Sequence, residues 1–270
     1  MSQKNTNILD RIIATKQQEV AVGKQKQSIK DLRQLIQQQS PPRGFFKAIE
    51  KRVSGNCTAV IAEVKKASPS KGIIREDFDP TAIAQSYQAG GATCLSILTD
   101  QAYFKGNDDY LQQVKQVVEL PVLRKDFMVD PWQIHQSRAL GADCVLLIVA
   151  CLSDDQLFEF NDLAQDLGMD VLIEVHDELE MDRALRTSAN LIGINNRNLK
   201  TFKTSLKTSQ VLKPMVTGSD RLVVSESGIH DSKDIKFLQQ NDIHTFLIGE
   251  SLMRHDDPGK QLALLMSGMV

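Results

Sequence analysis

Eight short, almost entirely apolar runs recur between residues 57 and 250, and they restrict the possible folds more than any other feature of this chain. Parallel strands have this pattern because both of their faces are buried, whereas half-exposed strands alternate apolar and polar residues. Helix signals separate the runs: Asp79-Pro80 and Asp130-Pro131 are typical helix starts, and Gly141 and Gly168 are typical helix ends. The runs cover residues 59–64, 94–98, 121–123, 144–149, 171–173, 191–194, 222–224 and 245–248.

Eight strands, each followed by a helix, predict closure into a (β/α)8 TIM barrel of the α/β class. The alternative is a doubly wound open sheet, which usually has fewer strands, and no G-x-G-x-x-G motif follows the first run. The length of 270 residues suits one barrel. We therefore expect a single barrel domain over 1–270.

The first forty residues lie outside this rhythm. Apolar residues at helical spacing predict a helix over 7–22 and a second helix that stops at Ser40-Pro41-Pro42. The segment is either a glutamine-biased surface arm or a helical extension over 1–45 that packs across one end of the barrel. The apolar helix faces favour the second interpretation, because they must be covered.

Charge and composition narrow the partners and the location. The formal net charge is −2 with no polybasic stripe, which argues against nucleic-acid and membrane-surface binding. The N-terminus lacks the apolar segment of a secretory signal, and no apolar run is long enough to cross a membrane. The four cysteines show no metal-like spacing, so we expect no metal and no cofactor. We expect a cytoplasmic protein that is a monomer or a weak homo-oligomer.

Charged and amide residues stand at the ends of several runs, where barrel enzymes carry out their chemistry. One such residue alone is usually a solvated rim group. A set that converges on one mouth is different, because crowded acids and bases neutralise one another and shift their proton affinities. The converging residues are Glu63, Lys65, Lys125, Glu174, Asn195, Arg197 and Glu226.

The last two runs are followed by glycines that predict a phosphate site. Ser227-Gly228 and Gly249-Glu250 occupy the loops that commonly bind phosphate in this fold, and glycine lets backbone N–H groups approach an anion closely. The alternative is that these glycines only form tight turns. The basic, hydroxyl-rich loop 66–72 is either a lid over the same site or an ordinary solvated loop.

Residues 61–70 read IAEVKKASPS and resemble the first-strand signature I-A-E-x-K-x-x-S-P-S of the indole-3-glycerol phosphate synthase family. Residues 12–16 also resemble the N-terminal helix of that family, and only the glutamine-rich stretch matches loosely. The similarity therefore extends over almost the whole chain. Its further segments are 96–100, 103–106, 123–127, 193–199, 225–229 and 246–253.

The resemblance implies closure of the indole ring of 1-(2-carboxyphenylamino)-1-deoxyribulose 5-phosphate, with loss of carbon dioxide and water. It implies that Lys125 is the general acid for the ketone and that Glu174 is its carboxylate partner and a proton acceptor in the dehydration. Lys65 resembles the group that pairs with substrate anions or acts as a second acid, and Glu63 resembles the residue that positions this lysine or accepts a proton. Which lysine donates each proton in the dehydration stays open.

The remaining site residues follow from the same resemblance. Glu226 joins the catalytic set, and Asn195 and Arg197 orient the hydroxyl and carboxylate of the substrate. No metal is needed, because the iminium intermediate accepts the electrons that decarboxylation frees. The phosphate cradle comprises Ser68, Ser227, Gly228, Gly249 and Glu250, the last two through their backbone. Independently of the resemblance, the aromatic ring of such a substrate needs an apolar wall, for which the candidates are Phe104, Phe127, Leu146 or Leu147, Leu199 and Leu247. The alternative for each phenylalanine is ordinary packing in the barrel.

Other residues and other functions carry less weight. The histidines show no ligand or triad spacing and are expected at the surface or at helix edges, Trp132 is expected in packing, and Asn196 has no assigned role. Phosphoribosylanthranilate isomerase and the tryptophan synthase α subunit are alternative barrels. A Schiff-base aldolase needs a neutral Lys125, which Asp126 and Glu174 disfavour. A non-catalytic phosphometabolite sensor needs only the phosphate site.

Overall fold

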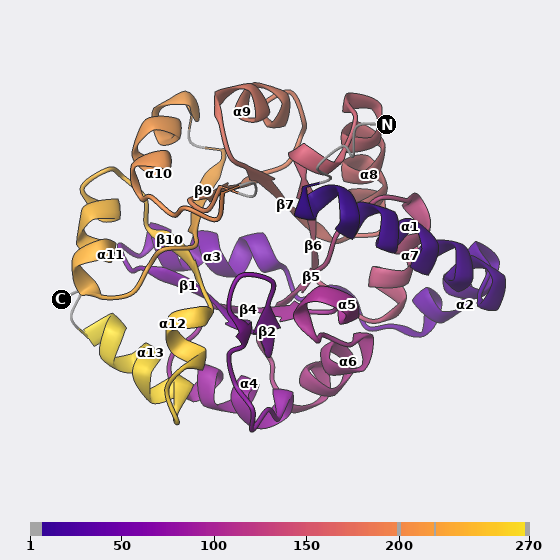
Figure 1. Ribbon diagram of the computed structural model, residues 1–270, viewed down its shortest axis with the longest axis horizontal. Coiled ribbons are helices and arrows are strands. Elements are labelled where there is room, and N and C mark those ends of the chain that lie inside the picture. Colours follow the sequence, from indigo (N-terminus) through magenta and orange to yellow (C-terminus); the bar gives the residue numbers. More distant parts are fainter. Residues whose placement is uncertain (1–6, 199–200, 219, 268–270) are drawn as a thin grey trace, which may run out of the picture.

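A closed barrel of eight parallel strands forms the centre of the computed structural model, which describes residues 7–198, 201–218 and 220–267 (Figure 1). The strands follow one another around the barrel in chain order, and the last pairs with the first, as Ile61 aligned with Leu247 shows. The predicted barrel is confirmed, and the strands match the eight apolar runs. They are β1 (Ala59–Val64), β4 (Cys94–Leu98), β5 (Val122–Lys125), β6 (Cys144–Ile148), β7 (Asp170–Val175), β8 (Leu191–Asn195), β9 (Leu222–Glu226) and β10 (Thr245–Ile248).

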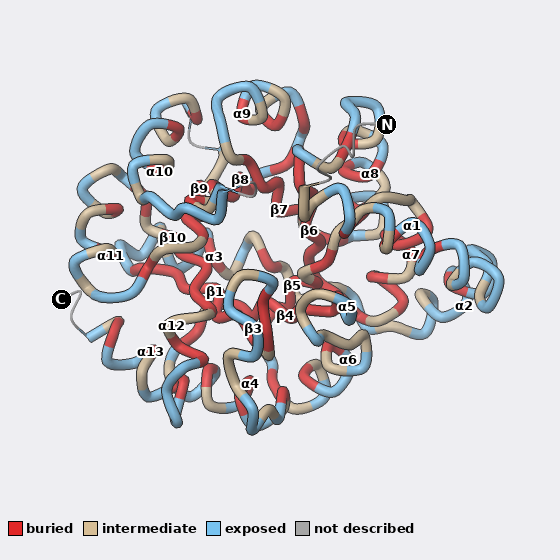
Figure 2. The backbone as a smooth tube through the Cα atoms, viewed as in Figure 1, coloured by how far each residue is buried: buried red, intermediate tan, exposed pale blue. Residues whose placement is uncertain are grey.

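Helices surround the barrel, and their solvent-facing sides are exposed while the strands are buried (Figure 2). The proline-containing starts behave as expected: the side chain of Asp79 caps one helix, and that of Asp130 forms a capping box on another. Among the described residues no helix has the length and apolar character that a membrane crossing requires. The outer helices are α4 (Pro80–Ala89), α6 (Asp108–Val117), α7 (Pro131–Ala139), α8 (Asp154–Asp166), α9 (Glu178–Ala184), α10 (Lys207–Leu212), α11 (Ser232–Gln239) and α13 (Pro258–Ser267).

Short elements occupy the loops between strands and helices. Two of them border the mouth, the helix α5 (Gln101–Phe104) and the helix α12 (Glu250–Met253). The loop after β1 carries a small antiparallel hairpin. The remaining short elements are β2 (Ala67–Ser68), β3 (Gly72–Ile73), and the 3-10 helices η1 (Val149–Cys151) and η2 (Lys213–Met215).

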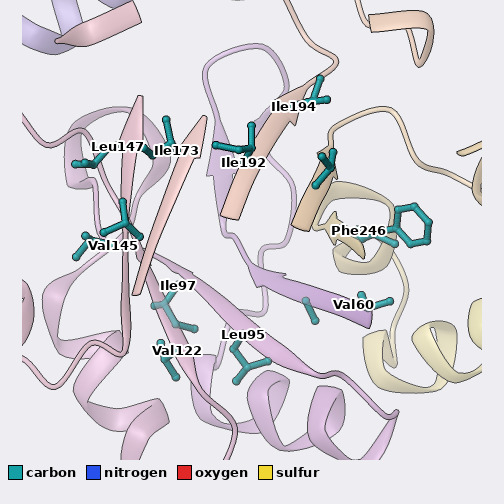
Figure 3. Packing of buried hydrophobic residues seen from close by; sticks show 14 of the residues in the cluster. Val60, Leu95, Ile97, Val122, Val145, Leu147, Ile173, Ile192, Ile194 and Phe246 are labelled. Carbon is teal, nitrogen blue, oxygen red and sulfur yellow. The ribbon is translucent and has the colours of Figure 1, made fainter. Parts of the chain in front are cut away.

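Alternate residues of each strand face opposite sides of the barrel wall. Val145 and Leu147 of β6 point outward into the main core beneath the helices, as do Val60 and Ile97 (Figure 3). Leu146, one position away, belongs to the smaller core inside the barrel. Because both faces are covered, the strands carry few polar residues until they reach the mouth.

Three helices precede β1: α1 (Ile8–Lys26), α2 (Ile29–Gln38) and α3 (Phe45–Ser54). The first extends four residues past its predicted end, and α3 is not among the helices predicted from the sequence. This helix closes the bottom of the barrel, where Phe45 and Ile49 are fully buried in the inner core. The backbone N–H of Phe46 also donates to Asp170 Oδ2 at the start of β7 (2.9 Å).

Helix α1 lies across the opposite end, so the extension packs on the barrel and is not a free surface arm. Val20 packs against Trp132 of α7, whose indole N–H donates to the carbonyl of Gln27. Lys16 is buried and pairs with Asp100 (3.1 Å) and Asp126 (2.9 Å). These two carboxylates outweigh the effect of burial and raise the pKa of Lys16. The charged cluster therefore fastens α1 to the loops around the mouth.

Candidate active site

The predicted site residues meet in one cavity at the carboxyl ends of the strands. Fifteen of the sixteen line this cavity, and the remaining one, Leu199, lies outside the described residues. Their strands are distant in sequence, so the barrel brings them together. The fifteen are Glu63, Lys65, Ser68, Phe104, Phe127, Lys125, Glu174, Asn195, Arg197, Glu226, Ser227, Gly228, Leu247, Gly249 and Glu250.

Lys125, the last residue of β5, has carboxylates on two sides. Its Nζ donates to Glu226 Oε2 at 2.7 Å and to Glu174 Oε2 at 3.2 Å. Burial alone would lower the pKa of Lys125, but Glu226, Glu174 and Glu63 outweigh it and raise the pKa far above its ordinary value. Lys125 is therefore a largely buried, firmly protonated ammonium group.

Glu63 and Lys65, at the end of β1, form a second ion pair at the mouth, with 2.6 Å between Lys65 Nζ and Glu63 Oε2. Burial acts to raise the pKa of Glu63, but Lys65 and Lys125 outweigh it, and the pKa falls below its ordinary value. The carboxylate lies against Gly249, where an added Cβ would sit 2.3 Å from Glu63 Oε2. Gly249 therefore has a steric role beside the one expected of it.

Three neighbours hold the carboxylate of Glu174. Oε2 accepts from Lys125, and Oε1 accepts from Asn195 Nδ2 (3.1 Å) and lies 3.3 Å from His176 Nε2. Burial acts to raise the pKa of Glu174, but Lys125 and His176 outweigh it and lower the pKa well below the ordinary range. The expectation that the histidines lie at the surface or at helix edges is wrong for His135, which is buried in α7, and for His176, which is largely buried beside Glu174. The period-two alternation along β7, which places residue 176 on the face of Glu174, was the available signal. His230 is exposed but lines the cavity.

The pKa of Glu226 shifts in the opposite direction to that of Glu174. Burial raises the pKa of Glu226 to about 7, although Lys125 acts to lower it. Glu226 Oε1 is buried and has no hydrogen-bond partner among the residues that the structure describes. Directly beneath it is Gly193, where an added Cβ would sit 2.3 Å from Oε1. Two carboxylates beside one lysine thus differ widely in proton affinity, as acid–base pairs in enzymes do.

The loop after β9 forms another wall of the cavity. Ser227 (φ 64°) and Gly228 (φ 81°) both adopt left-handed backbone conformations, which serine rarely does. Asn196, buried and without an assigned role in the sequence analysis, holds this turn: its Nδ2 donates to the carbonyls of Glu226 (2.9 Å) and Ser227 (3.1 Å). The side chain of Asn196 therefore shapes the predicted phosphate loop.

Arg197 joins three loops at the same edge of the mouth. Its guanidinium donates to Ser70 Oγ (2.7 Å) and to Glu250 Oε2 (3.3 Å). Ser70 belongs to the loop 66–72, and Ser68 from that loop lines the cavity, so the loop borders the mouth. Ser68 Oγ and Arg197 Nε are buried without hydrogen-bond partners within the described part of the chain. Such groups are costly unless a ligand satisfies them.

The other side of the cavity is apolar. The rings of Phe104 and Phe127 are 6.1 Å apart, and Leu146 lies at the barrel face of the same cavity. The sequence left Leu146 and Leu147 open, and the structure selects Leu146. Helix α1 adds Ile8 and Ile12 as a cover. The site thus combines a cluster of paired lysines and carboxylates with a polar edge at Ser68 and Arg197 and an apolar wall.

The sequence model of the indole-3-glycerol phosphate synthase family matches residues 9–265. The chain belongs to this family. A relative described as indole-3-glycerol phosphate synthase, from Bordetella pertussis (strain Tohama I), is 51% identical over 261 residues, covering 97% of this chain and 99% of the relative. The protein is therefore a carboxy-lyase of tryptophan biosynthesis, and membership implies a phosphorylated small-molecule substrate.

Solved structures from outside the family share the barrel of this synthase. Tryptophan synthase subunit alpha from Legionella pneumophila has a TM-score of 0.60 at 13% identity, covering 85% of this chain and 97% of its own. Thiamine phosphate pyrophosphorylase from Pyrococcus furiosus has a TM-score of 0.59 at 13% identity, covering 78% and 95%. Identities this low show a shared fold only.

No arrangement of three or more histidine, cysteine, aspartate or glutamate side chains within 7–198, 201–218 and 220–267 is suited to hold a metal ion. The charged side chains that line the cavity are lysine, arginine, glutamate, aspartate and histidine groups of the described residues. Lys125 in particular is held in the charged form, which opposes its use as a Schiff-base nucleophile.

Proposed function

We propose that this cavity is where the synthase closes the indole ring of 1-(2-carboxyphenylamino)-1-deoxyribulose 5-phosphate, and that Lys125 is the general acid of the first step. The aromatic carbon that bears the carboxylate attacks the ketone, and the ketone oxygen takes a proton as the new carbon–carbon bond forms. The observation that carries this assignment is the largely buried ammonium group of Lys125 between Glu226 and Glu174. A lysine in this setting is in the protonated form that a general acid requires, and it faces the cavity.

Decarboxylation follows from the same intermediate. The bond to the carboxylate breaks, its electron pair neutralises the iminium, and carbon dioxide leaves. In our proposal the apolar wall around Phe104, Phe127 and Leu146 takes the aromatic ring, and the carboxylate is desolvated beside it. Lys65 and Arg197 lie on the polar side, where Arg197 and Asn195 orient the substrate carboxylate and hydroxyl.

Dehydration requires an acid for the departing hydroxyl and a base for a ring proton. We assign the acid to Lys65, which Glu63 positions at 2.6 Å, and the base to Glu174. Glu226 is the carboxylate whose raised pKa suits return of a proton to Lys125. The loss of water restores the aromatic indole and gives indole-3-glycerol phosphate.

The phosphate group completes the proposed pose. We place it at the loop with the left-handed pair Ser227-Gly228, with the backbone of Gly249 and Glu250 and the hydroxyl of Ser68 as further donors. The unpartnered Ser68 Oγ supports this placement. The side chain of Glu250 is occupied by Arg197 and Arg254, so its contribution is through the backbone.

The Lys125→Ala variant tests the central assignment. We expect the substrate still to bind while turnover, followed by indole fluorescence, falls by on the order of a hundredfold or more, because the general acid is lost. Lys24→Ala is the matched control, since Lys24 is half-exposed and pairs only with Asp130. Unchanged turnover in Lys125→Ala excludes Lys125 as the acid. The same result would assign the proton donation to another residue.

We also propose that the synthase works in the cytoplasm as a monomer or a weak homo-oligomer. One chain supplies the cavity lining described above, so the proposed chemistry needs no second copy. The four cysteines are free thiols, which suits a reducing compartment. Light scattering across a concentration series tests the oligomeric state, and a stable oligomer at low concentration would contradict it.

A further inference from the structure

His176 lies just past the end of β7, on the outer side of Glu174. Its Nε2 is 3.3 Å from Glu174 Oε1, and its Nδ1 is 2.9 Å from Glu180 Oε2. The backbone N–H of His176 also donates to Glu180 Oε2 at 2.8 Å, so Glu180 is hydrogen-bonded to both the main chain and the ring of His176. The side chain is only 11% exposed. Nδ1 is hydrogen-bonded to Glu180, whereas the contact of Nε2 with Glu174 is an ion-pair contact without hydrogen-bond geometry among the described residues, so the ring lies between two carboxylates.

We propose that His176 is a positioning residue that, supported by Glu180, fixes the carboxylate of Glu174 toward Lys125 and keeps it ionised until the dehydration, when Glu174 accepts a proton. The inference rests on the proposed role of Glu174. The two oxygens of Glu174 are held differently: Lys125 takes Oε2, while Asn195 and His176 share Oε1. Without His176 the outer side of the carboxylate would keep only a neutral amide donor.

The charges around His176 favour its protonated form. Glu174 approaches from β7 and Glu180 from α9, while the thiol of Cys151 in η1 is close enough for both carboxylates to raise its pKa. Burial alone would lower the pKa of His176, but the two carboxylates outweigh it and raise the pKa to about 10. The open groove beside the ring also carries Asp177, Glu178 and Lys207.

This arrangement matters when Lys125 gives its proton to the ketone. At that moment Glu174 loses its principal counter-ion, and an isolated buried carboxylate would take up a proton. A protonated His176 on the other side supplies a second cation that the reaction does not discharge. Glu174 therefore stays an anion that is ready to accept a proton in the dehydration.

Kinetics of H176N and E180Q test the inference. In H176N we expect kcat to fall about tenfold with KM within about twofold, because a neutral donor replaces the cation without touching the substrate. The wild-type kcat should decline on the alkaline side near pH 10, where His176 loses its proton. In E180Q this alkaline limb, the decline of kcat at high pH, should move to lower pH by about one unit, because one of the two carboxylates beside His176 is gone. H244N is the control, since His244 is exposed and pairs only weakly with Asp242.

Glu174→Gln is measured in parallel to separate the two proposals. If Glu174→Gln is inactive while E180Q keeps the wild-type alkaline limb, the role of His176 is overturned and that of Glu174 stands. If Glu174→Gln turns over normally, both fall. A lower kcat in H176N without any movement of the limb in E180Q indicates a purely structural histidine and also overturns the proposal. E180Q decides the question even if H176N does not fold.

Discussion

Gly193 is the position where one added methyl group should damage the reaction most selectively. It lies in β8 inside the barrel, and a Cβ built there would sit 2.3 Å from Glu226 Oε1, whereas ordinary contacts are 3.4 Å or longer. The carboxylate of Glu226 must therefore shift by about 1 Å, which disturbs the geometry of its 2.7 Å contact with Lys125. Misplacement of catalytic groups by about 1 Å costs on the order of a hundredfold in rate, which is about 2.7 kcal/mol of transition-state stabilisation.

The assay is turnover of the anilino-ribulose phosphate followed by indole fluorescence in G193A. We expect kcat to fall by on the order of a hundredfold with a stability loss of only about 1–3 kcal/mol, the usual cost of overpacking. Gly55→Ala is the matched control, because its added Cβ would make contacts of 3.4 Å or more at a negative φ. Wild-type kcat in G193A would refute the idea that the placement of Glu226 against Lys125 limits the chemistry.

Three further predictions concern charge. Lys16→Met should destabilise the protein by about 3 kcal/mol in urea unfolding, because Asp100 and Asp126 lose a buried counter-ion. An unchanged midpoint of unfolding would contradict the proposal that Lys16 holds α1 against the loops around the mouth. Because the pKa of His176 is raised on folding, its charged form contributes stability that is complete below about pH 6.5 and is lost as the pH rises through about 10. H176N should therefore lower the free energy of unfolding more at pH 6 than at pH 10. Equal losses of stability at the two pH values would contradict this prediction. Borohydride treatment with a keto-phosphate should trap no adduct on Lys125, and a trapped adduct would show that this lysine becomes neutral.

Much of the fold could be read from the sequence because its signals are local. The apolar runs, the Asp-Pro helix starts and the glycine stops located all eight strands and the barrel. Helix α3 escaped notice, because Phe45 and Ile49 give a short helical pattern whose destination, the bottom of the barrel, no local signal specifies. The resemblance placed Glu174 beside Lys125, and the structure adds Glu226 at the shorter distance.

The amino-acid sequence by itself determined which residues face into the barrel. Side chains alternate between the two faces of a strand for steric reasons. Glu63, Lys125 and Glu174 each lie two residues after an apolar residue that faces the barrel interior, so they face the interior as well. Only the tertiary structure decided which of them touch. Lys125 and Glu226 come from strands that are not neighbours, and closure of the barrel across 101 residues of sequence brings them within 2.7 Å. Partner choice among convergent charges depends on barrel geometry and side-chain reach, which no local pattern encodes.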